Sequence, residues 1–386
     1  MSRGPAMSDS PEALPPHERI LTLDIVRGIA LLGILIMNMP GFSESFFAGA
    51  DGSHTFDDPV NRSAEALRDA LFSGKFNSMF SLLFGIGFTI QLGRLLEKEP
   101  DRAVFIYCRR LLVLLALGVV HMAVFWGGDV LHVYALLGFL LLLLRRVSDR
   151  VIIGIIVACL LYPALSRTAQ LLFVAPETMA QQLAIARTWE AADNLTFGHG
   201  TFLEAARLHA REFAYFYTDP MSLWGMFGFY VQMTTTMMLG FLIGRHGWVR
   251  RIGEFMPTIR RLQWWALGMG LVCSAVFGTG IQFIKPMEIS AWKIVISTCY
   301  VLSRLGLTSF YVLTVVRLAQ APAWQRRFAP IAATGRAPLT NYLMQTLFAT
   351  TLFYGWGVGL WGNVGPALQF ALAVAIYFAI QVPLSV

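Results

Sequence analysis

The feature of this sequence that most limits its fold is a series of long apolar runs. A helix needs about 20 mostly apolar residues to cross the hydrocarbon core of a bilayer. Ten runs approach or exceed that length, at about 20–39, 74–93, 104–126, 129–145, 151–174, 222–244, 263–284, 290–318, 339–361 and 365–385. We therefore predict an all-α, polytopic integral membrane protein with about ten transmembrane helices.

Composition excludes the main alternatives. Of the 386 residues, 56% are hydrophobic and 14% are charged, whereas a soluble domain carries about 25% charged residues. Disordered chains, collagen-like fibres and disulfide-stapled scaffolds all have different compositions. The four cysteines lie singly inside apolar runs, at positions 108, 159, 273 and 299. We therefore expect neither disulfides nor a metal site.

The distribution of charge predicts an orientation. A net charge of +7 would suggest nucleic acid as a partner of a soluble domain. Here, more than half of the 30 Lys and Arg residues fall in segments that face the cytoplasm when the N-terminus is placed inside. Such an excess sets topology, so we predict N-in and C-in. We therefore expect the basic loops to contact the anionic head groups of the lipid bilayer or a phosphorylated cytosolic cofactor, and not nucleic acid.

The same runs define the domain organisation. We predict a disordered N-terminus over 1–19 and a single transmembrane domain over 20–386. Two outer segments, 40–73 and 175–221, are long enough to carry function. The second contains an amphipathic helix over 201–217. In the predicted orientation these segments face the periplasm or the cell exterior, the side from which a substrate that accepts a transferred group would arrive.

Two charged residues interrupt the first run. Asp24 and Arg27 make a cleaved leader a poor interpretation, despite the small residues at 48–50, so we expect a retained helix. Their i, i+3 spacing allows them to pair. They form either a structural ion pair or a site in which Asp24 orients Arg27 toward a phosphate or carboxylate.

A second pair of polar residues lies near the outer end of this helix. Asn38 is in its last turn, and His54 follows in the outer segment. If that segment folds back, the two side chains can meet. Imidazole titrates near neutrality, which suits a general base.

A tight hairpin joins the third and fourth runs, because only two glycines separate Trp126 from Asp129. This turn places His121, Asp129 and His132 close together at the outer face. They form either a hydrogen-bond cluster that fixes the hairpin, or a functional group that relays protons or lines the binding site of an acceptor substrate. Two histidines and one aspartate make a poor zinc signature.

The ninth run begins with further polar residues. Arg336 precedes it, and Asn341 and Gln345 share one helix face. Free backbone N–H groups with Arg336 make an anion site. Interhelical hydrogen bonding by the two amides is the alternative.

The second and eighth runs also carry buried charge. Lys75, at the outer end of its helix, can line a cavity, and Arg304 lies deep in the eighth run and needs a partner. Ser78, Ser81 and Gly85 form a small-residue face that lets helices approach closely.

Several of these stretches resemble one family. They are Leu23-Asp24-Ile25-Val26-Arg27-Gly28 with Asn38, Gly74-Lys75-Phe76 with Leu83-Phe84-Gly85-Ile86-Gly87, Gly128-Asp129-Val130-Leu131 with Tyr134, and Gly335-Arg336 through Gln345. In this order they resemble the YeiB-like proteins, the domain of unknown function 418 group. The resemblance implies a multi-pass protein of the bacterial inner membrane. Family members usually continue with a tryptophan-bearing tail after the last span, and this sequence stops at Val386 without that tail, which puts any role of the tail in doubt.

The resemblance also implies an activity. The first helix of the group is similar to that of transmembrane acyltransferases, including the lysosomal heparan glucosaminide acetyltransferases. In those proteins, cytosolic acetyl-CoA donates an acyl group to a sugar on the far side. An Asn at the outer end of the first helix and a nearby loop His serve the transfer, and Asn38 and His54 match them in order and approximate spacing.

These observations predict a membrane acyltransferase that uses acyl-CoA, and no metal, to modify a small-molecule or glycan acceptor. The expected catalytic residues are His54, Asn38, His121 and Asp129. The expected donor-binding residues are Asp24, Arg27, Arg336, Asn341 and Gln345. The expected acceptor-binding residues are Lys75, His132 and Arg304. A transporter of a small solute and a non-catalytic assembly protein remain open, as does a homodimer.

Overall fold

The computed structural model describes residues 16–386, with side chains from Leu21 onward. Every regular element in this range is helical. They are α1 (Pro16–Ser43), α2 (Pro59–Leu71), α3 (Lys75–Lys98), α4 (Ala103–Val120), η1 (His121–Phe125), α5 (Leu131–Leu144), α6 (Asp149–Phe173), α7 (Pro176–His199), α8 (Phe202–Thr218), α9 (Pro220–Arg245), η2 (Trp248–Phe255), α10 (Met256–Phe283), α11 (Trp292–Leu318), α12 (Pro322–Arg336), α13 (Pro338–Phe353), α14 (Pro366–Ile376), η3 (Tyr377–Gln381) and α15 (Val382–Ser385).

The predicted disordered segment 1–19 falls mainly outside the described residues. Its last four residues are described, and they belong to α1, which begins at Pro16. At its other end α1 continues through Pro40 to Ser43, beyond the predicted boundary at 39.

Eight helical segments of the described chain are long and apolar enough to cross a membrane. They are Leu21–Ser43, Pro59–Lys98, Ala103–Phe125, Asp149–Phe173, Pro220–Arg245, Trp248–Phe283, Trp292–Leu318 and Pro366–Ser385. The chain is therefore a helical membrane protein, with fewer full-length spans than the ten predicted.

The two predicted runs that fall short contain shorter helices. In the run 129–145, only the 14 residues of α5 are helical. In the run 339–361, α13 has 16 residues and stops at Phe353. Beyond it, the Gly355 amide donates to the Phe197 carbonyl at 2.7 Å. This contact with α7 replaces the next helical hydrogen bond, which hydropathy alone does not reveal.

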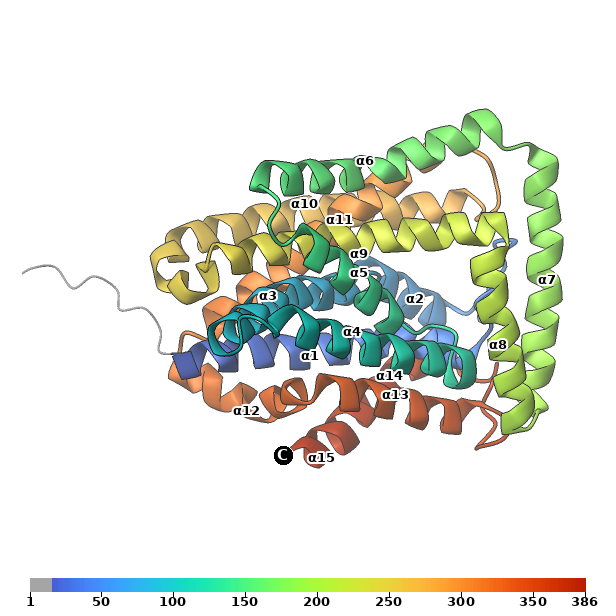
Figure 1. Cartoon of the computed structure of the whole chain (residues 1–386). Helices are drawn as coiled ribbons and strands as arrows, with labels where there is room; N and C mark the ends of the chain where they lie inside the picture. The colour runs from blue at the N-terminus through green and yellow to red at the C-terminus, as the bar shows by residue number, and fades with distance from the viewer. Residues whose placement is uncertain (1–15) are drawn as a thin grey trace, which may run out of the picture.

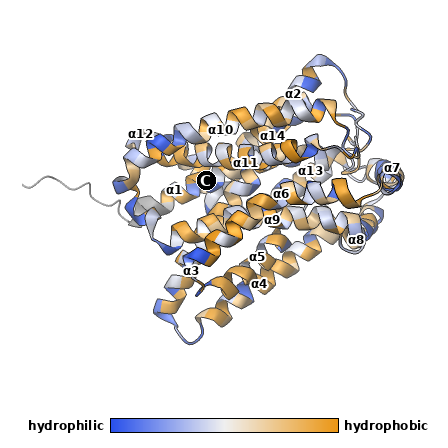
Figure 2. Ribbon diagram, turned by 90° about the horizontal axis from the view of Figure 1, so that it is seen from above, coloured by the Kyte–Doolittle hydropathy of each residue, from blue (hydrophilic) through white to orange (hydrophobic). Residues whose placement is uncertain are grey.

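Most long helices run side by side, and α7 and α8 lie across one end of them (Figure 1). We call this the capped end, and the opposite end, where α3 and α9 finish, the basic end. The predicted outer segment 175–221 is thus mostly two helices. The helix expected over 201–217 is α8, confirmed at Phe202–Thr218. Hydrophobic residues dominate the middle of the long helices, and hydrophilic residues gather toward the two ends (Figure 2).

Helix α1 lies at the centre, packed against α3, α12, α13 and α14. Glycines permit the closest of these approaches, since a Cβ on Gly335 would lie 1.9 Å from the Asp24 carbonyl oxygen. The small-residue face of α3 is confirmed in the same way. Ser78 and Ser81 are fully buried, and a Cβ on Gly85 would lie 2.1 Å from the Met237 carbonyl oxygen of α9.

Candidate functional site

The hairpin between α4 and α5 brings three polar residues together at the capped end, as its length predicts. His121 Nδ1 lies 3.0 Å from Asp129 Oδ1, and His132 Nδ1 lies 2.8 Å from Asp129 Oδ2. The His132 backbone N–H also donates to Oδ2, at 3.1 Å. All three side chains are buried. We call these residues the Asp129 cluster.

The outer nitrogens of both histidines connect the cluster to other helices. His121 Nε2 is 3.0 Å from Thr346 Oγ1 on α13. His132 Nε2 is 2.6 Å from the Tyr217 hydroxyl on α8. Every nitrogen and oxygen of the three side chains thus has a partner, which is how a buried polar group avoids its desolvation penalty. The geometry is that of a cluster fixing the hairpin; the catalytic role predicted for His121 and Asp129 and the acceptor role of His132 stay predictions.

A second buried polar chain lies beside the first, and sequence reasoning missed most of it. Ser45 Oγ donates to Asp193 Oδ2 at 2.5 Å. On α8, His209 Nδ1 is 3.0 Å from Glu212 Oε2. His209 Nε2 is 3.2 Å from the Tyr354 hydroxyl. The i, i+3 spacing of His209 and Glu212 on the predicted amphipathic helix is the sequence signal that could have identified them.

Asp193 and Glu212, which we call the carboxyl pair, share a proton. Both side chains are fully buried, and they are close enough to hydrogen-bond each other. Asp193 Oδ1 and Glu212 Oε1 have no other partner among the described residues. Two carboxylates can form this contact only when one is protonated. Burial raises the pKa of both groups to about 8, so the pair keeps at least one proton at neutral pH.

His209 is neutral in this environment. Burial lowers its pKa to about 3, and the neighbouring His121 lowers it further. A neutral ring can donate from Nδ1 to Glu212 and accept at Nε2 from Tyr354, which matches both contacts. Hydrogen bonds thus join Ser45 to Asp193, and Glu212 through His209 to Tyr354. A proton held between the two carboxyl groups would connect these two segments.

Above the carboxyl pair, a cleft of about 260 Å³ opens at the capped end. Its polar lining includes Glu44, Ser45, His54, Glu65 and Arg68; we call it the His54 cleft. His54 Nδ1 lies 3.2 Å from Glu65 Oε2 on α2, with 36% of the His54 side chain exposed. Burial raises the pKa of the Glu44 carboxyl. A neighbouring cleft of about 500 Å³ shares Glu44 and Ser45.

The structure does not bring Asn38 to His54 within the described residues. Asn38 is half-buried on α1, and the residues that line the His54 cleft begin at Pro40. Among the described residues the two share no hydrogen bond and no cleft, since α1 stays helical through Pro40 and Glu65 on α2 holds the imidazole; a joint role stays a prediction.

At the basic end, four arginines line a cleft of about 650 Å³. They are Arg27, Arg94, Arg245 and Arg250, and none of the described residues that line this arginine cleft is acidic. Arg27 Nη1 donates to Asp24 Oδ1 at 2.8 Å, which confirms the predicted pairing and leaves its other nitrogen atoms available. Arg245 is engaged by Asp149 at 2.8 Å and by backbone carbonyls.

The remaining residues expected at the donor site lie elsewhere at this end. Arg336 is exposed at the end of α12, and its charge reaches Asp24. The Asn341 amide donates to the Thr334 carbonyl and to Ser385 Oγ, both at 3.2 Å. The Gln345 amide donates to the Leu31 carbonyl at 3.1 Å and to Gln381 at 3.0 Å. Both amides thus make the interhelical hydrogen bonds of the alternative interpretation.

Lys75 and Arg304 lie together in the interior, apart from both clefts. Each is fully buried. Lys75 Nζ donates to the Asp69 carbonyl at 3.0 Å, and Arg304 Nη2 donates to the Gln232 carbonyl at 3.1 Å. The partner that Arg304 needs is thus a backbone carbonyl, and Arg304 Nε and Nη1 have no partner among the described residues.

Comparison with known proteins places the chain in a family. The family model described as "Protein of unknown function (DUF418)" matches residues 243–386. The uncharacterized protein YxaH of Bacillus subtilis (strain 168) is 30% identical over 378 residues, which cover 93% of this chain and 88% of that protein. The chain belongs to the YeiB-like DUF418 family. The uncharacterized protein YeiB of Escherichia coli (strain K12) is 27% identical over 388 residues, covering 92% of this chain and 89% of YeiB. No solved structure matches the chain.

The motifs that carry the DUF418 resemblance meet in space. Gly335 packs on the Asp24 backbone, which joins the α1 and α12 motifs. The Tyr134 hydroxyl, from the hairpin motif, donates to the Asn77 carbonyl of α3 at 3.2 Å. In this DUF418 member, the stretches that identify the family are therefore the contacts that hold α1, α3, α5 and α12 together.

Proposed function

We propose that the protein is a membrane-embedded acyltransferase. It would move an acyl group, acetyl in the simplest case, from a cytosolic acyl-CoA to a small-molecule or glycan acceptor at the capped end. The observation that carries the proposal is the pair of unlike clefts at opposite ends of α1. Among the described residues, one cleft is lined by arginines without acids, and the other contains an accessible histidine held by a carboxylate.

The arginine cleft supports donor binding. Arg94 and Arg250 form no ion pair among the described residues, and Arg27 uses one nitrogen on Asp24. Guanidinium groups bind phosphate oxygens in a bidentate fork, so an acyl-CoA carries the charge this cleft lacks. In the proposed N-in orientation this end faces the cytoplasm of a bacterial cell, where acyl-CoA is made.

The His54 cleft supports acceptor chemistry. His54 would take the proton from an acceptor hydroxyl or amine, and Glu65 would orient the imidazole. The deprotonated atom attacks the thioester carbonyl carbon, the C–S bond breaks, and the proton on His54 passes to the departing thiolate. Asn38 would stabilise the carbonyl oxygen as charge develops. Because Asn38 does not line the His54 cleft, this role of Asn38 requires the bound acyl-CoA to extend along α1 from the arginine cleft.

The experiment is to titrate purified full-length protein with acetyl-CoA and to follow radiolabelled acetyl transfer to a crude membrane glycan extract. The Arg94→Gln/Arg250→Gln double variant should lose about tenfold or more in affinity, since each lost charge-assisted contact is worth roughly 1.5–3 kcal/mol. Arg326→Gln, an exposed arginine of α12 outside the cleft, is the matched control. Absence of acetyl-CoA binding in the native protein contradicts the proposal.

The base is tested separately. His54→Ala should lower the transfer rate about 10²- to 10⁴-fold, the usual contribution of a general base, while acetyl-CoA binding is unchanged. An unchanged rate removes His54 from the mechanism.

The transporter alternative rests on the uncompensated interior charge of Lys75 and Arg304, because buried charges often mark substrate pathways. Counterflow of a solute in liposomes, with no covalent product, would favour it over acyl transfer.

A further inference from the structure

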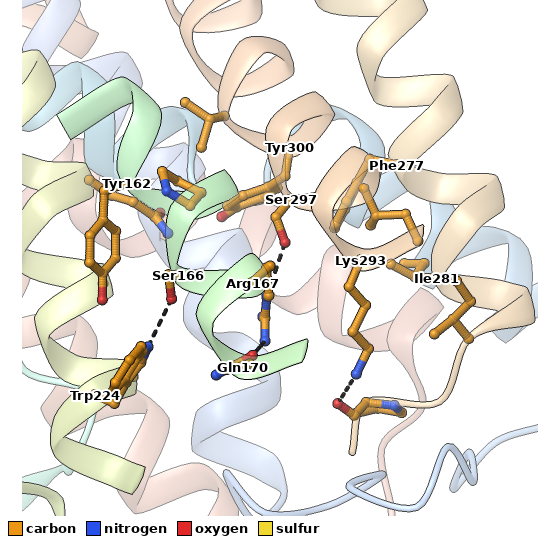
Figure 3. A pocket seen from close by; sticks show the side chains of 18 of the residues that line it. Tyr162, Ser166, Arg167, Gln170, Trp224, Phe277, Ile281, Lys293, Ser297 and Tyr300 are labelled. Atoms are coloured by element: carbon orange, nitrogen blue, oxygen red, sulfur yellow. Dashed lines mark hydrogen bonds between the residues drawn. The ribbon is translucent and has the colours of Figure 1, made fainter. Parts of the chain in front are cut away.

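A third cleft at the capped end belongs to neither part of the proposed reaction. It has a volume of about 590 Å³ and lies among α6, α9, α10 and α11. Figure 3 shows its lining, with Arg167 from α6 beside Ser297 and Tyr300 from α11, and with Lys293 nearby. We call it the α6–α11 cleft.

Two cations in this cleft have only neutral partners. Arg167 donates to Ser297 Oγ at 3.2 Å and to Gln170 Oε1 at 2.6 Å. Lys293 Nζ donates to the Pro286 carbonyl at 2.6 Å. Neither forms an ion pair with a carboxylate of the described chain, and the acid whose charge reaches Lys293 is Glu288, outside the lining. The cleft therefore holds positive charge without a counterion.

A third cation, Arg304, lies next to the residues that line the cleft. Lys293, Ser297 and Tyr300 line the cleft from one face of α11, and Arg304 follows Tyr300 by four residues on that face. Gly74 leaves room for both side chains, because a Cβ there would lie 2.5 Å from the Tyr300 hydroxyl and 2.9 Å from Arg304 Cδ.

Arg304 is also short of partners. Its Nη2 donates to the carbonyl of Gln232, another lining residue, at 3.1 Å. Its Nε and Nη1 are buried and unpartnered among the described residues. An uncompensated charge at this depth is costly and marks a site that meets its counterion from elsewhere.

The surroundings of these cations are apolar and face outward. Tyr162, Trp224 and Phe277 line the cleft. Beside them, Leu165 of α6 is 64% exposed and Phe227 of α9 is 56% exposed. In a membrane-spanning bundle, such side chains contact lipid tails. The cleft thus opens sideways onto the bilayer.

We propose that the α6–α11 cleft binds a phosphate-headed anionic lipid. The lipid phosphate would lie between Arg167 and Lys293, close enough to Arg304 for electrostatic attraction. The acyl chains would pack on the apolar side chains at the rim of the cleft, Leu165 and Phe227 among them. Guanidinium forks match phosphate oxygens, and basic pockets between transmembrane helices bind anionic lipid head groups. A soluble anion would satisfy the cations but would leave the apolar rim without a role.

Native mass spectrometry of the detergent-purified full-length protein tests this inference. Phosphatidylglycerol and phosphatidylcholine with identical acyl chains are the two probes, so that only the head group differs. We expect tighter binding of phosphatidylglycerol. The Arg167→Gln/Lys293→Gln double variant should bind it about tenfold or more weakly and should bind phosphatidylcholine as before. Lys285→Gln, an exposed lysine next to a lining residue, is the matched control and should change neither.

Arg304 requires its own variant, because a buried change can prevent folding. Arg304→Lys keeps the charge and Arg304→Gln removes it, and a single symmetrical gel-filtration peak shows that each has folded. The Gln variant should lose more affinity for phosphatidylglycerol than the Lys variant.

Three results would overturn the inference. They are equal binding of the two lipids, unchanged binding in the double variant, and binding of inorganic phosphate as tight as that of phosphatidylglycerol, which would assign the cleft to a soluble anion. None of these measurements depends on acyl transfer, so the two proposals stand or fall separately.

Discussion

The Asp129 cluster and the carboxyl pair are neighbours at the capped end, yet they satisfy their buried charge in different ways. Asp129 accepts hydrogen bonds from His121, on the π-helical turn η1, and from His132, on α5. Asp193 and Glu212 have too few donors, and a shared proton fills the gap. The first arrangement is complete at any neutral pH, whereas the second depends on proton occupancy.

The difference teaches which cluster can respond to its surroundings. A saturated cluster holds helices together and resists change. A pair that must keep a proton also needs a path for exchanging it, and Ser45 connects this pair to the lining of the His54 cleft. The carboxyl pair is thus the buried group whose state the outer solution can alter.

The largest effect should come from breaking the saturated cluster. Asp129→Ala removes the acceptor of three hydrogen bonds and leaves buried imidazole nitrogens without partners. We expect a loss of about 3–5 kcal/mol in the free energy of unfolding, measured by thermal or denaturant unfolding in detergent.

The control for this change is Asp57→Ala. The Asp57 side chain is 88% exposed, and its nearest cation is 3.9 Å away, so it should cost less than about 1 kcal/mol. A loss at Asp129 as small as that at Asp57 would contradict the view that the cluster holds the hairpin.

The next largest effect should be a pH dependence from the carboxyl pair. With folded pKa values near 8, the folded protein keeps a proton that the unfolded chain has already released. Stability therefore falls as pH rises toward about 8. The window from about 6.5 to 9 contains this effect. His209 is neutral in the folded state throughout it, and its titration in the unfolded chain, near pH 6.5, affects only the acidic edge.

Glu212→Gln should flatten this dependence. The amide can accept from His209 and donate to Asp193, which replaces the shared proton by a permanent donor. Unfolding temperatures measured across the window should converge at the acidic side, and the variant should be the more stable protein at pH 9. Parallel curves for the two proteins would show that no proton is shared.

The contrast between the two clusters also shows which parts of the site can be predicted from the sequence. His121, Asp129 and His132 were predictable because a two-glycine turn leaves little freedom, so their meeting follows from local geometry. Asp193 and Ser45 are 148 positions apart, and only the folding of α7 across the bundle brings them together. The arginine cleft has the same origin, since Arg27 was expected but Arg94 and Arg250 join it from α3 and from the 3₁₀ helix η2.

The difference between the ten predicted runs and the eight long apolar segments has a related reason. Hydropathy registers apolar character but not where a helix must stop to make a tertiary contact. The run 339–361 is mostly apolar, yet its helix stops where Gly355 packs against Gly198, since a Cβ on Gly355 would lie 2.6 Å from the Gly198 carbonyl oxygen.

The smallest effect should come from Ser45, the link between the carboxyl pair and the cleft. Ser45→Ala removes one hydrogen bond to Asp193, which should cost about 1–3 kcal/mol. Because Asp193 then loses its only side-chain donor other than the shared proton, its hold on that proton should increase. The midpoint of the pH-dependent loss should therefore move upward, measured by unfolding between pH 6.5 and 9. Ser63→Ala, an exposed serine on α2, should leave the midpoint unchanged, and a midpoint unmoved in Ser45→Ala as well would separate Ser45 from the pair.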